Sequence, residues 1–448
     1  MEQLGTGEVE RLVSRTVRIG DPPFRAVLET ATRPRTVWSA PGDATVVGSG
    51  AAATITANGP ERFARVREAA EALFETGDVH AGTEAARPRL FGGFAFHDEG
   101  AERSPWEAFP DARFVFPRVQ VTYADNGTWL TVNAVGPDAT AEAVETRLEA
   151  ERERLRDLTD GPMAPRPGIR ERTRTTALDD WREGVEAAVS RIRAGDLRKV
   201  VLAQALEVDL ATSLSVSDTL VRLGEKYPDC HRFLVEPPDG EASFFGATPE
   251  RLVSVRGRTV ETGALAGTTG RGETPTEDEW LARELMGSEK NIHEHDLVAE
   301  TIRDQLAPFA ASVAMGERQV RRLATVQHLW TPITAELERN YHVLDLVEAL
   351  HPTPAVGGLP PADALQTIRE TEPFDRGWYA APVGWIDAAG YGSFAVALRS
   401  AVASGRTVTL FAGVGIVADS DPDREWDEVQ LKYRPILDEL EADATVRS

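Results

Sequence analysis

Lysine is rare in this sequence, and one lysine stands where it could act as a base. Of the 49 lysine and arginine residues only four are lysines, namely Lys199, Lys226, Lys290 and Lys432. Unlike a guanidinium, an ammonium group can lose its proton when it is desolvated. On the strand expected at 198–210, Lys199 shares a face with Val201 and Ala203. Desolvation on that apolar face would make Lys199 a candidate general base. The alternative is a lysine that reaches solvent from the start of a strand.

A glutamate stands at the end of another expected strand. In the segment FFGATPERL, Glu250 comes directly after a proline. A carboxylic acid at this place could protonate a leaving group if burial raises its pKa. The alternative is a turn glutamate on an acidic surface.

Two helical segments carry carboxylates that could bind a divalent cation. The two histidines of SEKNIHEHDLV would point to opposite sides of a helix, which argues against a zinc site there. Glu294 between them is the better ligand, for magnesium, because hard cations take oxygen ligands. In EWDEVQLK, Glu425, Glu428 and Lys432 share one helix face and could hold a cation and meet its anionic ligand. In both segments the alternative is a solvated acidic helix.

Two glycine-rich segments need separate interpretations. The segment TVTLFAGVGIVADS imitates a dinucleotide-binding fingerprint, but no helix begins at its glycines. The backbone amides of Gly413 and Gly415 could instead bind a carboxylate. The segment GALAGTTGRG at 263–272 lacks the lysine of a phosphate-binding loop, and we expect it to form a flexible turn.

Composition limits the class of protein. Hydrophobic and charged contents of 42% and 27% are those of a soluble globular protein. The net charge of −23 argues against nucleic acid and anionic membranes as partners. Cys230 is the only cysteine, so neither a disulfide framework nor a multi-cysteine zinc site is expected. Without an apolar run of membrane-spanning length or a signal-peptide pattern, we expect a cytoplasmic protein, and we expect it to be monomeric. The excess of arginine and acidic residues is typical of a surface adapted to high salt (a halophilic protein).

The elements that must position these residues alternate along the chain. The sequence predicts helices at 62–77, 139–158, 179–195, about 276–306 and at the acidic C-terminal end, and strands at 89–96, 113–124, 128–136, 198–210, 242–249, 251–263, 325–337, 382–388, 393–404 and 407–417. The proline-rich stretch at 160–175 is expected to link an N-terminal lobe, 1–165, to a catalytic region, 176–442. We therefore predict an α+β fold with large, mostly antiparallel sheets flanked by helices.

Taken together, the motifs resemble those of the chorismate-utilising enzymes, and within them the isochorismate synthases. The family's order is followed by FGGFAF, KVVLA, FGATPERL, ALAGT, KNIHEH, QHLW, LHPTPAVGG, RGWYAAPVGW, VALRSA, AGVGIV and EWDEVQLK, over most of the chain. One such motif would be weak evidence, whereas the ordered set is strong evidence. The resemblance implies the anthranilate-synthase-like fold of this family, with a central cleft.

The subfamily rests on three places in the sequence. Isochorismate and salicylate synthases resemble this chain in having a lysine at the Lys199 position. Aminodeoxychorismate synthases often have a lysine where this chain has Ala266, and HPTPAVGG is similar to the isochorismate form. The resemblance implies a magnesium-dependent isomerase that interconverts chorismate and isochorismate, in menaquinone biosynthesis or, second, in siderophore biosynthesis. The alternatives are a salicylate synthase, an amine-transferring enzyme and an inactive chorismate-binding protein.

The resemblance also implies roles for individual residues. Lys199 would deprotonate a water that attacks C2 of chorismate, and Glu250 would protonate the departing C4 hydroxyl. Mg²⁺ would be held by Glu294 and Glu428, with Glu425 close by. The expected substrate-binding residues are Tyr379, Arg399, Gly413, Gly415, Lys432, His328, Thr268 and Ala355. No glutaminase subunit is expected to be required. The chain departs from the family pattern at Gln204, Asn291 and Ser393.

Overall fold

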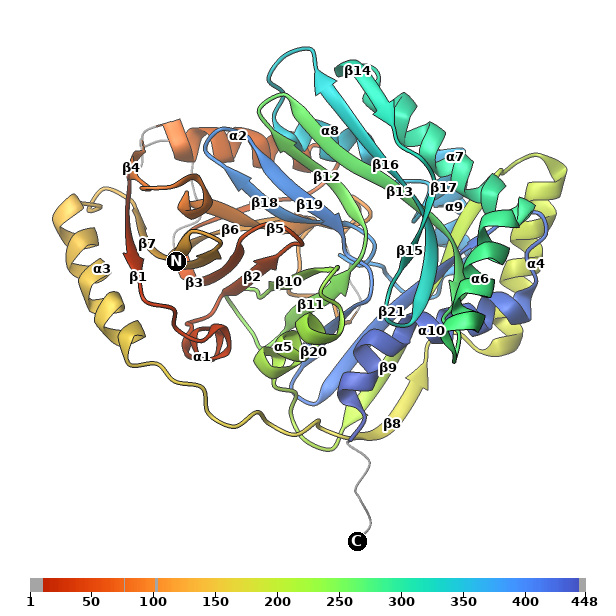
Figure 1. The fold of residues 1–448 in the computed structure, drawn as a ribbon, viewed down its shortest axis with the longest axis horizontal. Coiled ribbons are helices and arrows are strands. Elements are labelled where there is room, and N and C mark those ends of the chain that lie inside the picture. Colours follow the sequence, from red (N-terminus) through yellow and green to blue (C-terminus); the bar gives the residue numbers. More distant parts are fainter. Residues whose placement is uncertain (1–10, 76, 101–103, 443–448) are drawn as a thin grey trace, which may run out of the picture.

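The structure, a computed structural model, describes residues 11–75, 77–100 and 104–442 (Figure 1). Its strands form one extensively hydrogen-bonded sheet system, with helices on its outer faces. Among the described residues, β1 and β4 are parallel, and the other strand pairs are antiparallel. The predicted α+β class with mostly antiparallel sheets is therefore confirmed.

The N-terminal elements are built around mostly antiparallel strands, of which β3 and β6 are the longest. The strands are β1 (Leu12–Ile19), β2 (Arg35–Ser39), β3 (Thr45–Ala57), β4 (Asp78–His80), β5 (Arg89–Phe94), β6 (Ala112–Ala124) and β7 (Gly127–Val135). The helices are α1 (Phe24–Thr30), α2 (Arg62–Glu75), η1 (Glu84–Ala86) and α3 (Ala141–Arg156). Helix α2 packs on β3 and β6, and α3 covers β1 and β7 (Figure 1).

The remaining elements form the larger part of the chain. The strands are β8 (Ile169–Arg174), β9 (Lys199–Leu210), β10 (His231–Val235), β11 (Ser243–Thr248), β12 (Arg251–Arg256), β13 (Thr259–Gly270), β14 (Ala310–Met315), β15 (Gln319–Arg322), β16 (Val326–Leu337), β17 (Gly358–Leu359), β18 (Pro382–Asp387), β19 (Gly392–Val396), β20 (Ser400–Ser404) and β21 (Thr407–Ile416). The helices are α4 (Leu178–Ala194), α5 (Val216–Lys226), α6 (Pro275–Gly287), α7 (Glu289–Leu306), α8 (Val343–Leu350), α9 (Pro361–Thr371) and α10 (Pro422–Leu440).

The two parts of the chain share hydrogen-bonded strands. β2 pairs with β10, and β5 pairs with β18. Residues 159–168, between α3 and β8, form no helix or strand, whereas β8 lies at the end of the expected linker and pairs with β9. Aromatic side chains also join the parts, because Trp106 packs against Phe244 and Phe411 with ring centroids 5.3 Å apart in both contacts. The N-terminal residues therefore support the strands that carry the catalytic candidates.

Six elements surround the region where the candidate residues meet. β9 pairs with β21 along most of its length, and α10 packs on β21. β13 pairs with β16, and α7 packs on both strands (Figure 1). The sequence predicts one helix over about 276–306, which is wrong. The chain breaks at Ser288, whose side chain caps α7 by accepting a hydrogen bond from the backbone N–H of Asn291.

The prediction of a flexible turn at 263–272 is also wrong. This segment continues β13 as far as Gly270 and pairs with β16. Its register shifts between Ala266 and Thr268, where Gly267 has a φ of 76°. Glycine adopts such a backbone without the cost that a Cβ would add, so the glycines of this segment serve a bulge within a strand.

Two long expected strands are each divided in the structure. The segment 251–263 turns at Gly257 and forms the hairpin of β12 and β13. The segment 393–404 is split into β19 and β20, and Arg399 just before β20 has a φ of 49°. A non-glycine residue in this region of backbone space is uncommon and marks a place where the surroundings fix the chain. Arg399 stands at this bend and lines the central cavity of the fold.

Candidate active site

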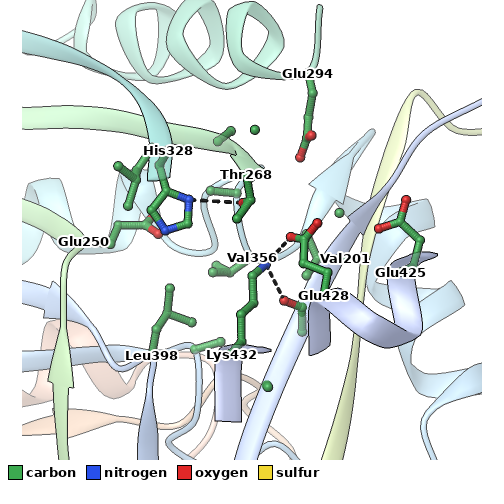
Figure 2. Close-up of a pocket in the computed structure, with 18 of the residues that line it drawn as sticks. Val201, Glu250, Thr268, Glu294, His328, Val356, Leu398, Glu425, Glu428 and Lys432 are labelled. Carbon is green, nitrogen blue, oxygen red and sulfur yellow. Dashed lines mark hydrogen bonds and ion pairs between the residues drawn. The ribbon is translucent and has the colours of Figure 1, made fainter. Parts of the chain in front are cut away.

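A cavity of about 460 Å³ lies between the β9–β21 and β13–β16 strand pairs, with α7 and α10 on its sides (Figure 2). All of the predicted site residues line this one cavity, namely Lys199, Glu250, Thr268, Glu294, His328, Ala355, Tyr379, Arg399, Gly413, Gly415, Glu425, Glu428 and Lys432. The ordered motifs of the sequence thus converge in space, although they come from segments more than 200 residues apart.

Lys199 is buried at the start of β9. Its side chain is 1% exposed, so the alternative of a lysine that reaches solvent is wrong. Its Nζ lies 2.9 Å from Oε1 of Glu294, which projects from α7. Burial alone would raise the pKa of Glu294, but the adjacent Lys199 ammonium holds the pKa below its ordinary value. Glu294 is therefore a carboxylate at neutral pH, with its charge balanced by a lysine.

Glu250 follows β11 and is buried in the wall of the cavity (Figure 2). The alternative of an exposed turn glutamate is therefore wrong. Burial raises the pKa of Glu250 to about 7, although the positive charges of Lys199 and Lys432 oppose the shift. A carboxyl group with this pKa is half protonated at neutral pH and can act as a proton donor.

Three side chains form a directional hydrogen-bond chain on one wall. Arg399 donates from Nη2 to Nε2 of His328 over 3.0 Å, and His328 Nδ1 lies 3.1 Å from Oγ1 of Thr268 (Figure 2). Burial, with Arg399 adjacent, holds the pKa of His328 well below its ordinary value, so the imidazole is neutral. Since arginine only donates, the histidine proton must be on Nδ1, on the side of Thr268 and the backbone of Gly267. The threonine hydroxyl is then free to donate to a ligand.

Arg399 has a second donor group that is unsatisfied, and the residue lines the cavity. Its Nη1 is buried and has no hydrogen-bond partner among the described residues. A buried guanidinium N–H without a partner is costly, and a carboxylate is the group that best satisfies it. Tyr379 lines the same cavity, and its ring stacks on Phe411 with centroids 5.3 Å apart. The arrangement can bind a carboxylate.

The glycines of β21 present backbone groups to the cavity. On β9, Ala203 stands opposite Gly413 and Val201 stands opposite Gly415. The backbone N–H groups of Ala203 and Val201 donate to groups outside β21. The carbonyl of Gly413 accepts a hydrogen bond from Lys432 over 2.9 Å. In a strand the N–H and C=O of one residue point to the same side. The amides of both glycines therefore face away from β9, toward the cavity.

A side chain at position 415 would disturb the Lys199–Glu294 pair. A Cβ there would lie 2.5 Å from Glu294 Oε1 and 2.8 Å from Lys199 Cε. We expect Gly415→Ala to lower kcat at least tenfold, because small displacements of reacting groups are costly. Steady-state kinetics with thermal unfolding would measure this, with Gly20→Ala, which has open space around it, as the control. A wild-type kcat in Gly415→Ala would show that the pair needs no such placement.

The acidic residues of the cavity suit a hard cation by their chemistry. Glu294, Glu425 and Glu428 face one another from α7 and α10 (Figure 2), and carboxylate oxygens are the ligands that Mg²⁺ prefers. They do not form a closed cage, because no three histidine, cysteine, aspartate or glutamate residues converge on one point in the part of the chain that the structure describes. Each carboxylate instead contacts a lysine, with Glu425 on Lys290 at 3.1 Å and Glu428 on Lys432 at 2.8 Å.

Sequence reasoning missed several residues that line the cavity, and two of them matter most to its geometry. Lys290 is one, and three of the four lysines therefore line the cavity. The rarity of lysine in this chain was the signal that could have found it. Arg376 is the other, and its guanidinium is paired with Glu372 and donates to the carbonyls of Val201 and Val356. It joins β9 to the loop before β17 and so shapes the cavity wall. No sequence pattern distinguished it from the other arginines.

None of the helices in the described ranges is long and apolar enough to cross a membrane.

Comparison with known proteins assigns the chain and its fold to one family. The chorismate binding enzyme family matches residues 1–441. The chain is 36% identical over 442 residues to the isochorismate synthase MenF of Bacillus subtilis, covering 95% of this chain and 92% of that protein. It is 38% identical over 396 residues to the salicylate biosynthesis isochorismate synthase of Pseudomonas aeruginosa, covering 88% and 82%.

Solved structures agree with the sequence relatives. MenF of Escherichia coli, a menaquinone-specific isochorismate synthase, superposes with a TM-score of 0.80 at 27% identity, covering 97% of each chain. Component I of anthranilate synthase from Streptococcus pneumoniae has the same fold, with a TM-score of 0.72 at 20% identity, covering 97% of this chain and 93% of that one. The chain belongs to the chorismate binding enzyme family.

Proposed function

We propose that this protein is an isochorismate synthase, an isomerase that interconverts chorismate and isochorismate with Mg²⁺. The observation that carries the proposal is a buried lysine and a buried glutamate of raised pKa on the walls of one cavity. These are the two groups that a water addition with loss of a hydroxyl requires. Similarity to the Bacillus subtilis and Escherichia coli MenF proteins supports the activity and a role in menaquinone biosynthesis. A siderophore route is the second candidate, since the Pseudomonas aeruginosa relative serves salicylate biosynthesis.

The chemistry balances with two proton transfers. Lys199 accepts a proton from a water as its oxygen bonds to C2 of chorismate, and the ring double bonds shift. Glu250 donates its proton to the C4 oxygen as that C–O bond breaks, and a water molecule leaves. In the substrate-free pocket Lys199 is an ammonium paired with Glu294, so it must give up its proton before it can act as the base. Glu250 must hold its proton, and exchange with solvent restores both groups after turnover.

The remaining residues bind and orient the substrate. Chorismate is a dianion, and one opposite charge at ~4 Å contributes about 4 kcal/mol at an effective dielectric of ~20. Arg399 and Tyr379 would bind the pyruvyl carboxylate, while Lys432 and the amides of Gly413 and Gly415 would assist. These local charges can outweigh the net charge of −23, which salt screens. Bound Mg²⁺, held by Glu294 and Glu428 with Glu425 close by, would neutralise the ring carboxylate.

We also propose a cellular location, an oligomeric state and a set of partners for the enzyme. We expect a cytoplasmic monomer that uses chorismate without a glutaminase subunit and binds neither nucleic acid nor membranes. The acidic, arginine-rich composition supports work at high salt.

Glu428→Gln is expected to weaken the magnesium dependence of activity. The loss of one anionic ligand should raise the Mg²⁺ concentration for half-maximal rate at least tenfold. Titration of the rate with MgCl₂ measures the effect. Asp427→Asn is the matched control, because Asp427 is exposed on the same helix and does not line the cavity. An unchanged titration in Glu428→Gln would remove Glu428 from the metal site.

Product analysis tests the function itself. The protein is incubated with chorismate and Mg²⁺, with and without EDTA, over a range of salt concentrations, and the products are separated by chromatography. Isochorismate formed only with available Mg²⁺ is the expected result. Salicylate formed without a lyase would identify a salicylate synthase, and an ammonia-dependent aromatic amine would identify an amine-transferring enzyme. Equal, near-zero turnover of the wild type and Lys199→Ala at every salt concentration would identify an inactive chorismate-binding protein.

A further inference from the structure

Lys290 lines the cavity but has no part in the proposed reaction. It stands in the first turn of α7, and its Nζ contacts Oε1 of Glu425 in the first turn of α10, at 3.1 Å. The lysine side chain is 37% exposed, whereas the glutamate is 4% exposed. The pair thus joins the two helices at the edge of the cavity, with the ammonium partly in water and the carboxylate buried.

This contact is one of three of the same kind. Glu294 contacts Lys199 at 2.9 Å, and Glu428 contacts Lys432 at 2.8 Å. Each carboxylate that would bind a cation is therefore neutralised by its own ammonium. The three carboxylates also do not converge on a single point among the described residues. A divalent cation that binds the contacted carboxylate oxygens must displace an ammonium from them.

We propose that Lys290 is the counter-ion of Glu425 that competes with the divalent cation and so sets the metal affinity of the substrate-free pocket. The inference rests on the proposed magnesium dependence. The ammonium and the metal need the same buried carboxylate, and they repel each other when both are close to it. Lysine suits this role because its ammonium is a compact, strongly hydrated charge on a flexible stem. The partial exposure of Lys290 gives the released ammonium access to water.

Lys290 is the member of the three pairs whose removal is informative. Lys199 and Lys432 are assigned to the base and to substrate binding, so their loss would change several properties together. If Lys290 served only to link α7 to α10, its removal would loosen the helices and weaken metal binding. Competition with the metal predicts tighter binding instead. The sign of the change in affinity therefore separates competition from support.

The test is metal binding to the substrate-free protein at fixed pH, measured by calorimetry with Mg²⁺ and by electron paramagnetic resonance with Mn²⁺. Lys290→Met is expected to tighten binding about fivefold to tenfold, given that a partly exposed ion pair alone changes an equilibrium by up to about fivefold. Lys290→Gln, which keeps a hydrogen-bond donor for Glu425, should tighten binding similarly. Lys290→Arg, which keeps the charge, should stay within about twofold of the wild type.

Lys226→Met is the matched control. Lys226 pairs with Asp438 at 2.7 Å, its side chain is 39% exposed, and it does not line the cavity. Its replacement should leave the metal affinity unchanged. Unchanged or weaker binding by both Lys290→Met and Lys290→Gln, in proteins whose thermal unfolding matches the wild type, would overturn the role of Lys290 alone. A wild type that binds neither metal would overturn the magnesium site and this inference together.

Discussion

Lys199→Ala is expected to lower kcat about a thousandfold while chorismate binding stays measurable. A positioned general base contributes roughly 10²- to 10⁴-fold, and no other lysine of the cavity is paired with Glu294. Arg399 and Lys432 remain to bind the dianion, so affinity should fall less than turnover. Stopped product assays give kcat, and calorimetric titration with chorismate gives the dissociation constant.

Folding must be controlled in this variant, because the substitution leaves Glu294 buried without its partner. Removing one member of a buried pair is destabilising, so circular dichroism and thermal unfolding accompany the kinetics. Lys226→Ala, which removes a lysine outside the cavity, should behave as the wild type. Retained activity of Lys199→Ala at neutral pH would take the base role away from Lys199.

Glu250→Gln should also lower kcat about a thousandfold, because an amide cannot donate the proton that the C4 oxygen needs. The pKa of Glu250 is about 7, so the protonated form is present below this pH and declines above it. The wild-type kcat/KM should therefore fall on the alkaline side of about pH 7. A profile without such a fall between about pH 7 and pH 9 would contradict the assignment of Glu250 as the acid.

The same substitution should stabilise the fold at alkaline pH. The pKa of Glu250 is raised in the folded protein, so the folded state keeps its proton to higher pH than the unfolded state does. The stability that this proton provides is present below the unfolded pKa and is lost as pH rises through about 7. Glutamine does not titrate. The free energy of unfolding of Glu250→Gln should therefore rise by about 2 kcal/mol relative to that of the wild type when the pH is raised from about 5.5 to about 8.5. Urea unfolding at both pH values measures this, with Asp427→Asn as the control.

The structure brings the predicted site residues to one cavity, and their roles stay predictions, whereas several of the predicted elements are wrong. Three residues were singled out because their types are unusual for their positions. Lys199 enters an apolar run, Glu250 follows a strand, and Glu294 lies between two histidines. The structure places them in one cavity. What the sequence could not contain is the pairing between distant residues. The contact between Lys290 and Glu425 joins positions 135 residues apart, and no local pattern predicts it.

The errors in secondary structure have local causes. The β3 segment TVVGSGAAATITA was not predicted as a strand, because its glycines and alanines give no clear alternation of apolar and polar residues. The break between α6 and α7 was missed because one serine cap interrupts an otherwise helical pattern. The glycines at 263–272 were taken for a turn, whereas pairing with β16 holds them in a strand with one bulge. In the two strand segments, pairing with neighbouring strands outweighed local propensity, whereas the helix break is a local capping signal.

The most direct measurement is the reaction of chorismate with the Mg²⁺-loaded protein in water enriched in oxygen-18, with the product analysed by mass spectrometry. Addition of water at C2 with loss of the C4 hydroxyl predicts isochorismate that carries one heavy oxygen at C2, formed by the wild type and not by Lys199→Ala. Isochorismate without the label, or a product other than isochorismate, would contradict the proposed reaction.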